Sequence, residues 1–276
     1  MTHVTRAVWL ALALCGAVPS VASAQGGRCD RACLIGIANQ YLDALAAKDP
    51  AKAGLAGSVR YSENGQRLRI GDGVWNSMSG KGTYQLHVAD AAAGQILTIQ
   101  TMRENGTPII LATRLKVADR RITEVETIVA RSENGNHSTN ARGRDGQPRP
   151  DPKTASNYAG MWTCREQFES GLLHFVSRIR DRRYVAVDEE HGVVAALVFF
   201  DHDAGKSRTF QTPSGRTVTA GPTTPWTWHI AEIFKVEKGL LHEIEAVLER
   251  APYGMTSGWS SFENGMSDQI QWEDVR

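Results

Sequence analysis

The chain contains two versions of one ten-residue pattern, "ITEVETIVAR" at residues 122–131 and "LHEIEAVLER" at residues 241–250. Glu fills the third and fifth places and Arg the tenth place of both, and apolar residues fill matching places. A Lys-Val pair precedes each pattern by six residues, and a D-x-x-x-G segment lies further upstream, at 90–94 and at 188–192. Because these signals occur twice in the same order, the sequence predicts two related structural units.

The repeated pattern is predicted to be a β-strand, although its second version, taken alone, also fits an amphipathic helix. The first version follows the short segment "ADRR" (118–121). β-rich runs separated by such short turns are typical of an antiparallel meander. Glu124 and Glu126 should therefore share one face of that strand. Three further strands are predicted before it, in "TYQLHVAD" (83–90), "QILTIQTM" (95–102) and "TPIILATRLKV" (107–117).

A helix is predicted ahead of the strands, in "CDRACLIGIANQYLDALAAKD" (29–49). Its apolar residues recur on one helical stripe, and Asp30 is a suitable N-terminal cap. A helix followed by an antiparallel meander predicts an α+β fold.

The sequence divides into four segments. Residues 1–24 are typical of a signal peptide, with Arg6 before an apolar run and small residues before Gln25, so the protein is expected to be periplasmic or secreted. Residues 25–131 form the first predicted domain, and 132–157 have the composition of a linker. Residues 158–276 form a second domain, interrupted at 205–225 by a predicted loop or flap.

The charge balance argues against polyanionic partners. Arg6 is the only charged residue of the leader, so the mature chain has 31 − 1 = 30 basic and 30 acidic residues. A neutral chain lacks the basic surface that nucleic acids and anionic membranes attract, and neither is expected as a partner. The short basic run at 178–184 is interpreted as a solvated face.

Three cysteines, Cys29, Cys33 and Cys164, remain after processing. In an exported protein they predict one disulfide and one free thiol. Cys29 and Cys33 are one helical turn apart, so each is expected to reach Cys164 more readily than its neighbour.

Residues 29–131 resemble the nuclear transport factor two-like (SnoaL-like) superfamily. The resemblance rests on the order of a helix, a "SENG" hairpin at 62–65, a short helix and a four-stranded meander. A tandem branch of that superfamily, the sphingomonad lignin-dimer formaldehyde lyases, is similar in further motifs. These are "YSENGQRLRIGDGVW", "RDRRYVAVDEEHGVV", "FFDHDAG", "IAEIFKVEKGLLHEIEAVL" and "PYGMTSGW".

The resemblance implies two tandem cone-like curved antiparallel sheets with covering helices, the second copy lacking its leading helices. It also implies a cofactor-independent lyase that cleaves a carbon–carbon bond in an aromatic, lignin-dimer-like substrate and releases formaldehyde. The resemblance implies neither a cofactor nor a metal. It also implies that the protein forms a small homo-oligomer. Two alternatives stay open, a dehydratase or isomerase of a small hydrophobic substrate and a non-catalytic small-molecule-binding protein.

In the first copy, strand alternation selects the candidate site residues. Tyr84 should point with the apolar side chains of its strand and His87 away from them, as a pocket acid–base group or a rim histidine. Arg114 stands among apolar neighbours and needs an anionic partner, either a substrate or Glu126 on the next strand. Tyr61 and Trp75 are candidate aromatic walls, although such residues also serve as core, and Tyr61 is a candidate catalytic group.

In the second copy, "PWTWHIAEIF" (225–234) places Trp228 and Glu232 on one face and His229 on the other. Glu232 lies between apolar residues and should have a raised pKa, suited to a general base or to a satisfied core carboxyl. His87, Arg114, Tyr61 and Glu232 are the predicted catalytic residues. The predicted substrate-binding residues are Trp75, Tyr84, Trp228, His229 and Glu126.

Overall fold

The computed structural model describes residues 29–131, 169, 171–205, 207–211 and 217–259. The predicted leader, the predicted linker and Cys164 lie outside these residues.

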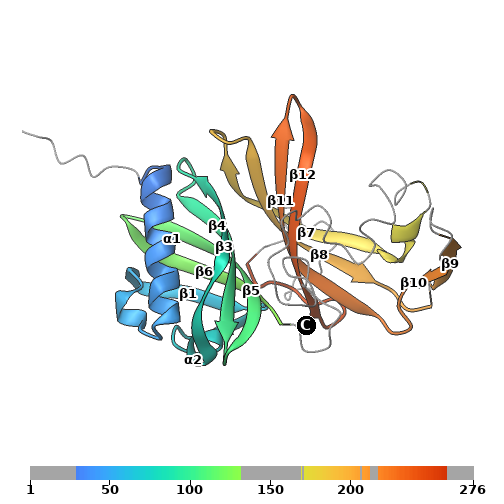
Figure 1. The fold of residues 1–276 in the computed structure, drawn as a ribbon, viewed down its shortest axis with the longest axis horizontal. Coiled ribbons are helices and arrows are strands. Elements are labelled where there is room, and N and C mark those ends of the chain that lie inside the picture. The colour runs from blue at the N-terminus through green and yellow to red at the C-terminus, as the bar shows by residue number, and fades with distance from the viewer. Residues whose placement is uncertain (1–28, 132–168, 170, 206, 212–216, 260–276) are drawn as a thin grey trace, which may run out of the picture.

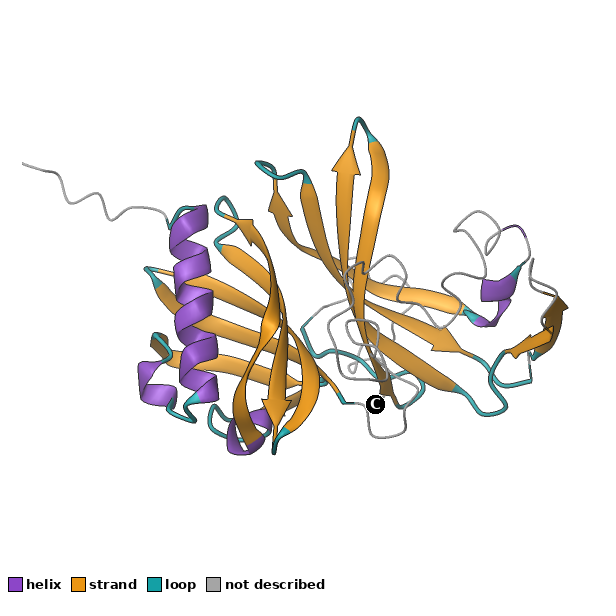
Figure 2. Cartoon of the chain, in the orientation of Figure 1, coloured by secondary structure: helices purple, strands orange, loops and turns teal. Residues whose placement is uncertain are grey.

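The described chain forms two large β-sheets, a separate two-stranded sheet of β9 and β10, and one long helix, with several short helical segments (Figure 1, Figure 2). The first sheet has six strands in the order β2-β1-β6-β5-β4-β3, and the second has four in the order β12-β11-β8-β7. Neighbouring strands are antiparallel except β1 and β6, which are parallel. This is an α+β protein with two sheets, as predicted at that level. The elements are α1 (Arg31–Ala46), η1 (Pro50–Lys52), β1 (Leu55–Glu63), β2 (Gln66–Leu68), α2 (Val74–Ser77), β3 (Met78–Asp90), β4 (Gln95–Glu104), β5 (Thr107–Ala118), β6 (Arg121–Ala130), η4 (Leu172–Phe175), β7 (Arg178–Asp188), β8 (Val193–His202), β9 (Arg208–Gln211), β10 (Thr217–Ala220), β11 (Trp226–Glu237) and β12 (Leu240–Ala251).

The start of α1 corrects the disulfide prediction. Asp30 caps the helix as predicted, because its carboxylate accepts a hydrogen bond from the Cys33 backbone N–H at 2.8 Å. Cys29 precedes this extended cap residue and forms a disulfide with Cys33, their Cα atoms 5.2 Å apart. The expectation that each reaches Cys164 is therefore wrong. It treated both cysteines as helical, whereas the non-helical backbone at Asp30 leaves Cys29 within disulfide distance of Cys33.

The repeated motifs occupy equivalent places in the two sheets. Gly94 and Gly192 have φ values of +62° and +60°. Their carbonyl oxygens accept hydrogen bonds from the N–H groups of Val117 and Val236, at 2.8 Å in each case. The strand ladder also shifts register at both Lys-Val pairs. The two motifs thus build the same bulged turn twice, which confirms that the sequence signals mark equivalent structure.

The two faces of the first sheet are covered differently (Figure 1). One face packs against α1 in a core that includes Leu42, Trp75 and Val125. The opposite face packs against the second sheet, where Leu97 of β4 and Leu197 of β8 belong to one buried cluster. The described residues therefore form three layers, a helix, a six-stranded sheet and a four-stranded sheet.

The structure adds detail to two further predictions. Residues 205–225, expected to be a loop or flap, include the antiparallel hairpin of β9 and β10. The basic run at 178–184 is a solvated face only in part, because Arg182 and Tyr184 are exposed whereas Arg180 and Asp181 are only 3% and 0% exposed. Their side chains are turned into the interior, where they meet acidic and polar partners.

Candidate functional site

The helix-covered face of the first sheet is filled by the protein's own side chains. Tyr41 and Leu42 of α1 and Trp75 of α2 are all buried. The Trp75 ring meets Tyr41 edge-on, with the ring centroids 5.4 Å apart. Trp75, a candidate substrate wall, is thus a core residue in this structure.

Tyr61 lies on the same face, where β1 borders this core. Its hydroxyl donates to Glu63 Oε2 at 3.0 Å, and the same oxygen accepts from the Val74 N–H at 2.6 Å. Burial, reinforced by Tyr41 and Glu63, raises the pKa of Tyr61. Its phenol therefore stays protonated and acts as a hydrogen-bond donor rather than a base.

His87 also turns away from the side chains that pack on the second sheet, as alternation predicted. Burial, with a smaller effect of Arg31 in α1, lowers its pKa. Its Nδ1 is buried without a hydrogen-bond partner in the described structure. His87 belongs to the edge strand β3, whereas Tyr61 belongs to β1, four strands away in the sheet order. The structure does not bring these two residues together.

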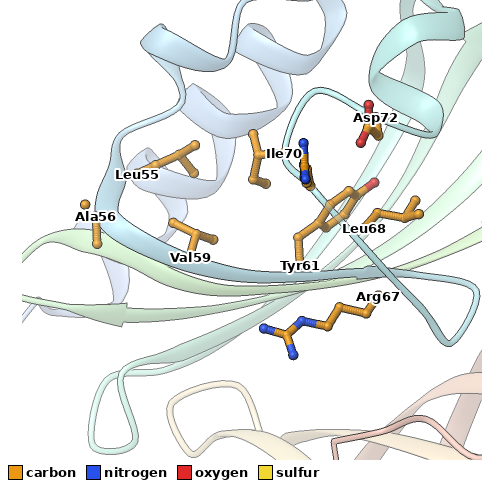
Figure 3. A pocket seen from close by; sticks show the side chains of 10 residues that line it. Leu55, Ala56, Val59, Tyr61, Arg67, Leu68, Ile70 and Asp72 are labelled. Carbon is orange, nitrogen blue, oxygen red and sulfur yellow. The ribbon is translucent and has the colours of Figure 1, made fainter.

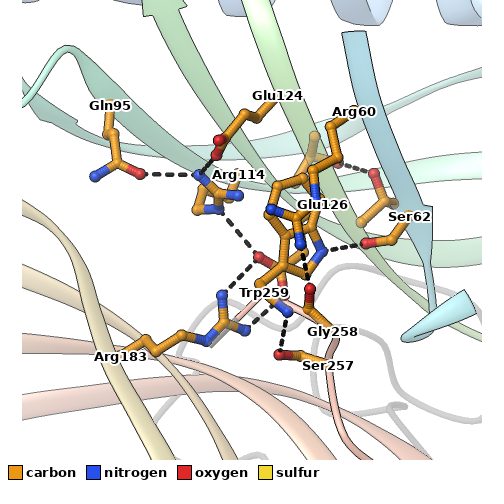
Figure 4. Close-up of polar contacts among 12 residues, drawn as sticks. Arg60, Ser62, Gln95, Arg114, Glu124, Glu126, Arg183, Ser257, Gly258 and Trp259 are labelled. Atoms are coloured by element: carbon orange, nitrogen blue, oxygen red, sulfur yellow. Dashed lines mark hydrogen bonds and ion pairs between the residues drawn. The ribbon is translucent and has the colours of Figure 1, made fainter. Parts of the chain in front are cut away.

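Arg114 projects from the opposite face, into the layer between the sheets (Figure 4). Its Nε donates to Glu126 Oε2 at 3.1 Å. Its Nη1 donates to Glu124 and Gln95 at 2.9 Å each. Arg183 of β7 donates from its two terminal nitrogens to both Glu126 oxygens, at 2.8 and 2.6 Å. The predicted pairing of Arg114 with Glu126 is confirmed, and the same carboxylate joins the two sheets.

Glu126 is a charged anchor between the sheets. Its side chain is 1% exposed, and burial alone would raise its pKa. The guanidinium groups of Arg183 and then Arg114 outweigh burial and hold the pKa at about 2. A carboxylate held in this way is ionised at neutral pH and saturated with donors. The arrangement favours a structural role for Arg114 and Glu126.

The end of the described chain completes this network. The Trp259 ring lies between the guanidinium groups of Arg60 and Arg114, whose Cζ atoms are 3.9 and 4.6 Å from the ring centroid. Its Nε1 donates to Ser62 Oγ at 2.6 Å. Ser257 donates to Asp181 at 2.8 Å. None of Arg183, Asp181 and Trp259 was selected from the sequence, although all three belong to the motifs that carry the family resemblance.

Two further predicted substrate-binding residues also lie between the sheets. The Tyr84 hydroxyl donates to both oxygens of Glu245 on β12, at 2.6 and 2.5 Å. The His229 ring stacks on Phe199 at 4.5 Å, and both of its nitrogens are buried without a hydrogen-bond partner in the described structure. Burial lowers the pKa of His229 to about 4, although the nearby Glu126 carboxylate acts in the opposite direction, so the ring is neutral at pH 7.

Glu232 lies on the outer face of the second sheet, turned away from the first. The residues directly opposite it are alanines, Ala196 on β8 and Ala246 on β12. Tyr184 of β7 is opposite Ala196, so Tyr184, Ala196 and Glu232 follow one another across three strands. Adjacent strands are about 4.8 Å apart, so Tyr184 and Glu232 start about 10 Å apart with only a methyl group between them.

The side chains around Glu232 are mostly apolar. Burial raises its pKa, as the sequence predicted, and no other cause contributes. Among the described residues its carboxylate forms no hydrogen bond or ion pair. Ile230, 1% exposed, and Phe234 are its neighbours on the same face of β11. The rim is open, because Tyr184 is 70% and Ile244 55% exposed.

An aromatic cluster continues this face towards the beginning of β11. The His202 ring stacks on Trp226 with 3.8 Å between centroids, and Trp228 meets His202 edge-on at 4.7 Å. Phe175 of η4 also stacks on His202, with 5.5 Å between the ring centroids. Trp228 and Glu232 therefore share a face, as predicted, with aromatic surface at one end and the carboxylate in the middle.

The four predicted catalytic residues thus lie in three separate environments. Tyr61 and His87 are on the helix side of the first sheet, Arg114 is between the sheets, and Glu232 is on the outer face of the second. Tyr184, which was not among the predicted site residues, lies on the same face as Glu232. Only Glu232 combines partial burial, an apolar surrounding and an adjoining exposed rim.

The described residues contain no group of three or more His, Cys, Asp or Glu side chains placed to hold a metal ion. Asp201, an acid at the end of β8, accepts hydrogen bonds from Arg178, Arg180 and the Thr227 hydroxyl. No helix in this part of the chain is long and apolar enough to cross a membrane.

Residues 118–248 match a protein family described as Domain of unknown function (DUF8021). The match runs from the last residue of β5 into β12, so it includes parts of both sheets. A crystal structure of a protein from Kribbella flavida DSM 17836 is similar at 19% identity, with a TM-score of 0.27, over 34% of this chain and 84% of that chain. No curated protein matches.

Proposed function

We propose that this protein is an exported, cofactor-independent lyase that works on the outer face of the second sheet. Its substrate is an aromatic, lignin-dimer-like molecule with a terminal hydroxymethyl group, and its product includes formaldehyde. The finer fold assignment belongs to the same proposal, namely two nuclear transport factor two-like cones, the second without its leading helices.

The observation that carries the proposal is the isolation of Glu232. A carboxylate on an apolar surface, without a hydrogen-bonding or cationic partner among the described residues, destabilises the folded state. A residue that carries such a cost is a candidate for a functional role. Its raised pKa brings it closer to neutral pH, where a general base is most effective. The two flanking residues are alanines, so only methyl groups adjoin the carboxylate on the neighbouring strands.

The position of this face in the fold also supports the proposal. The repeat pairs Val125 and Val129 of β6 with Ile244 and Leu248 of β12. The two valines lie in the core under α1. The outer face of the second sheet is therefore the counterpart of the helix-covered face of the first. Glu232 stands where the first copy has Thr113, so the acidic group is specific to the second copy.

The proposed reaction assigns separate roles to the two polar groups beside Ala196. The Tyr184 hydroxyl donates a proton to the benzylic hydroxyl of the substrate, which leaves as water. The substrate phenol passes its own proton through solvent to the Tyr184 phenolate, and the substrate becomes a quinone methide. Glu232 then takes the proton of the terminal alcohol. The carbon–carbon bond breaks, formaldehyde departs, and the electron pair returns to the ring, which regains a phenolic proton from solvent.

Formaldehyde release from a phenolic diarylpropane diol by the purified mature chain tests the proposal. The assay includes a chelator and compares wild type with Glu232→Gln and Tyr184→Phe. Removal of the base should lower kcat by about 100-fold or more. Tyr184→Phe should slow loss of the benzylic hydroxyl and leave substrate binding nearly intact.

Two variants provide matched controls, Glu237→Gln on the exposed end of β11 and Tyr253→Phe, another exposed tyrosine. Both should retain wild-type turnover. Formaldehyde release that is unchanged in Glu232→Gln would place the chemistry elsewhere in the chain. Turnover of a hydroxyketone without formaldehyde would favour a dehydratase or isomerase.

A non-catalytic binding protein is the second candidate, and one observation favours it. Around Glu232 the positions next along and across the sheet are Ile230, Phe234, Ala196 and Ala246, none of which titrates. A face with a single acid is also suited to hold an apolar ligand through one hydrogen bond. Tight binding of the diarylpropane without turnover by wild type would establish this alternative.

A further inference from the structure

A groove on the first sheet lies between β1 and the segment that links β2 to α2 (Figure 3). Its volume is about 700 Å³, which is within the range of about 300–1,000 Å³ typical of small-molecule sites. Its apolar lining includes Leu55, Val59, Leu68 and Ile70, with the ring of Tyr61 beside them.

The groove forms where β1 bulges away from β6. Leu55 pairs with Ile122 and Arg60 with Glu124, so 60 − 55 = 5 steps along β1 correspond to 124 − 122 = 2 steps along β6. Residues 56–59 therefore have no partner in the register of this ladder. Bulges of this kind leave backbone groups unpaired and are frequent beside functional sites.

Opposite charges accompany the apolar lining. Arg69 and Asp72 both border the groove and are exposed, and neither forms an ion pair among the described residues. Figure 3 shows Asp72 on the same side of β1 as Tyr61, whereas the Arg67 side chain extends to the other side. One cationic donor and one anionic acceptor thus stand beside an apolar wall.

We propose that this groove binds a small organic acid that carries a hydroxyl group on an apolar body. The apolar body packs against Val59 and Leu68. The ligand carboxylate pairs with Arg69 through charge-assisted hydrogen bonds, and the ligand hydroxyl donates to Asp72. The Tyr61 side chain is buried and its hydroxyl is directed to Glu63, so this residue supports the wall from the core side.

This site is separate from the proposed lyase site, because it belongs to the other sheet and shares no residue with it. The two proposals therefore fail independently. Glu232→Gln should abolish formaldehyde release without any effect on ligand binding in the groove.

Titration of the mature chain with 4-hydroxybenzoate, benzoate and phenol, followed by calorimetry or NMR, tests this inference. Loss of one charge-assisted hydrogen bond should weaken binding about tenfold. Benzoate and phenol should therefore each bind about tenfold more weakly than 4-hydroxybenzoate. Arg69→Gln should weaken 4-hydroxybenzoate and benzoate but leave phenol unchanged.

A filling variant provides the decisive comparison. A Cβ added to Gly57, which lines the groove, meets no atom within 4 Å, and the same is true of Gly80 on β3. Gly57→Phe should therefore abolish 4-hydroxybenzoate binding, whereas Gly80→Phe retains it. Unchanged binding in Gly57→Phe, or phenol binding as tight as 4-hydroxybenzoate, would overturn the proposal. Arg69→Gln tests the same groove without adding a bulky side chain. It therefore still decides the question if Gly57→Phe fails to fold.

Discussion

Arg183 donates to both carboxylate oxygens of Glu126, at 2.8 and 2.6 Å, and so ties the second sheet to the first. The pair is buried, and Glu126 also accepts a hydrogen bond from Arg114 within its own sheet. A bidentate contact of this kind fixes orientation as well as distance. These charged groups therefore help to orient two sheets that apolar side chains such as Leu97 and Leu197 also hold together.

Removal of one partner should destabilise the protein severely. Arg183→Met leaves Glu126 buried with one cation fewer, which is expected to cost about 3–5 kcal/mol in the free energy of unfolding. The double variant Arg183→Met with Glu126→Gln should recover part of that loss, because the buried Glu126 charge is removed together with its partner. The recovery should be incomplete, because Asp181 still loses its ion pair with Arg183. Urea unfolding of wild type, both single variants and the double variant measures the coupling.

The neighbouring Arg182 provides the control for this cycle. It is exposed on the same strand, so Arg182→Met should change the unfolding free energy by less than about 0.5 kcal/mol. Equal effects of Arg182→Met and Arg183→Met would show that the ion pair does not hold the sheets together.

The depressed pKa of Glu126 predicts a loss of stability in acid. The pKa is about 2 in the folded protein against an ordinary value of 4.5. Because the folded value is the lower one, the stabilisation is fully present above pH 4.5 and is lost as the pH falls towards 2. The shift corresponds to about 3 kcal/mol. Urea unfolding between pH 2 and 7 should show this loss in wild type, and Glu126→Gln should flatten the profile.

Glu232 should have the opposite effect, because burial raises its pKa. A carboxyl whose pKa is higher in the folded protein destabilises the fold increasingly as the pH rises through its unfolded and then its folded value. Glu232→Gln should therefore stabilise the protein at pH 7, by about 1 kcal/mol, while it removes activity. At pH 4 the difference should nearly vanish. If the Glu232→Gln protein is less stable than wild type at pH 7, this carboxylate must have a stabilising partner in the folded protein, contrary to our conclusion.

The order of elements in the first sheet was predictable because it depends on local signals. Asp30 caps a helix, and Asn64 and Gly65 form a two-residue turn with φ values of +48° and +78°. Turn residues of this type fix a hairpin register without help from distant residues. The repeat was predictable for a similar reason, since Gly94 and Gly192 each require a backbone conformation that favours glycine.

The candidate site was predictable only in part. Strand alternation placed Trp228 and Glu232 on one face and His229 on the other, because β11 pairs with β8 in continuous register. Alternation gave no such help in β7, where the ladder shifts register between Arg180 and Arg183 and Asp181 has φ +52°. The bulge changes which side chains point inward, so neither the buried ion pair nor the position of Tyr184 beside Ala196 followed from the sequence.

The disulfide makes a prediction for peptide mapping. Trypsin cleaves after Arg28 and after Arg31, between the two cysteines. A non-reducing digest should therefore yield the tripeptide of residues 29–31 joined to the peptide of residues 32–48. Reduction should separate them and shift both masses. Recovery of either peptide joined to the one that contains Cys164 would contradict the pairing of Cys29 with Cys33.

Trp259 should hold the segment that follows β12 against the first sheet. Its ring lies between Arg60 and Arg114, and Arg114 is fixed by Glu126, so the ring completes the charged layer. Trp259→Phe keeps an aromatic face for both guanidinium groups but loses the hydrogen bond to Ser62, which should cost about 1 kcal/mol. Trp259→Ala also loses two cation–π contacts and should cost about 2–4 kcal/mol. Urea unfolding should therefore rank wild type above Trp259→Phe and Trp259→Ala last, and equal losses in the two variants would show that the hydrogen bond, not the ring, makes the contact.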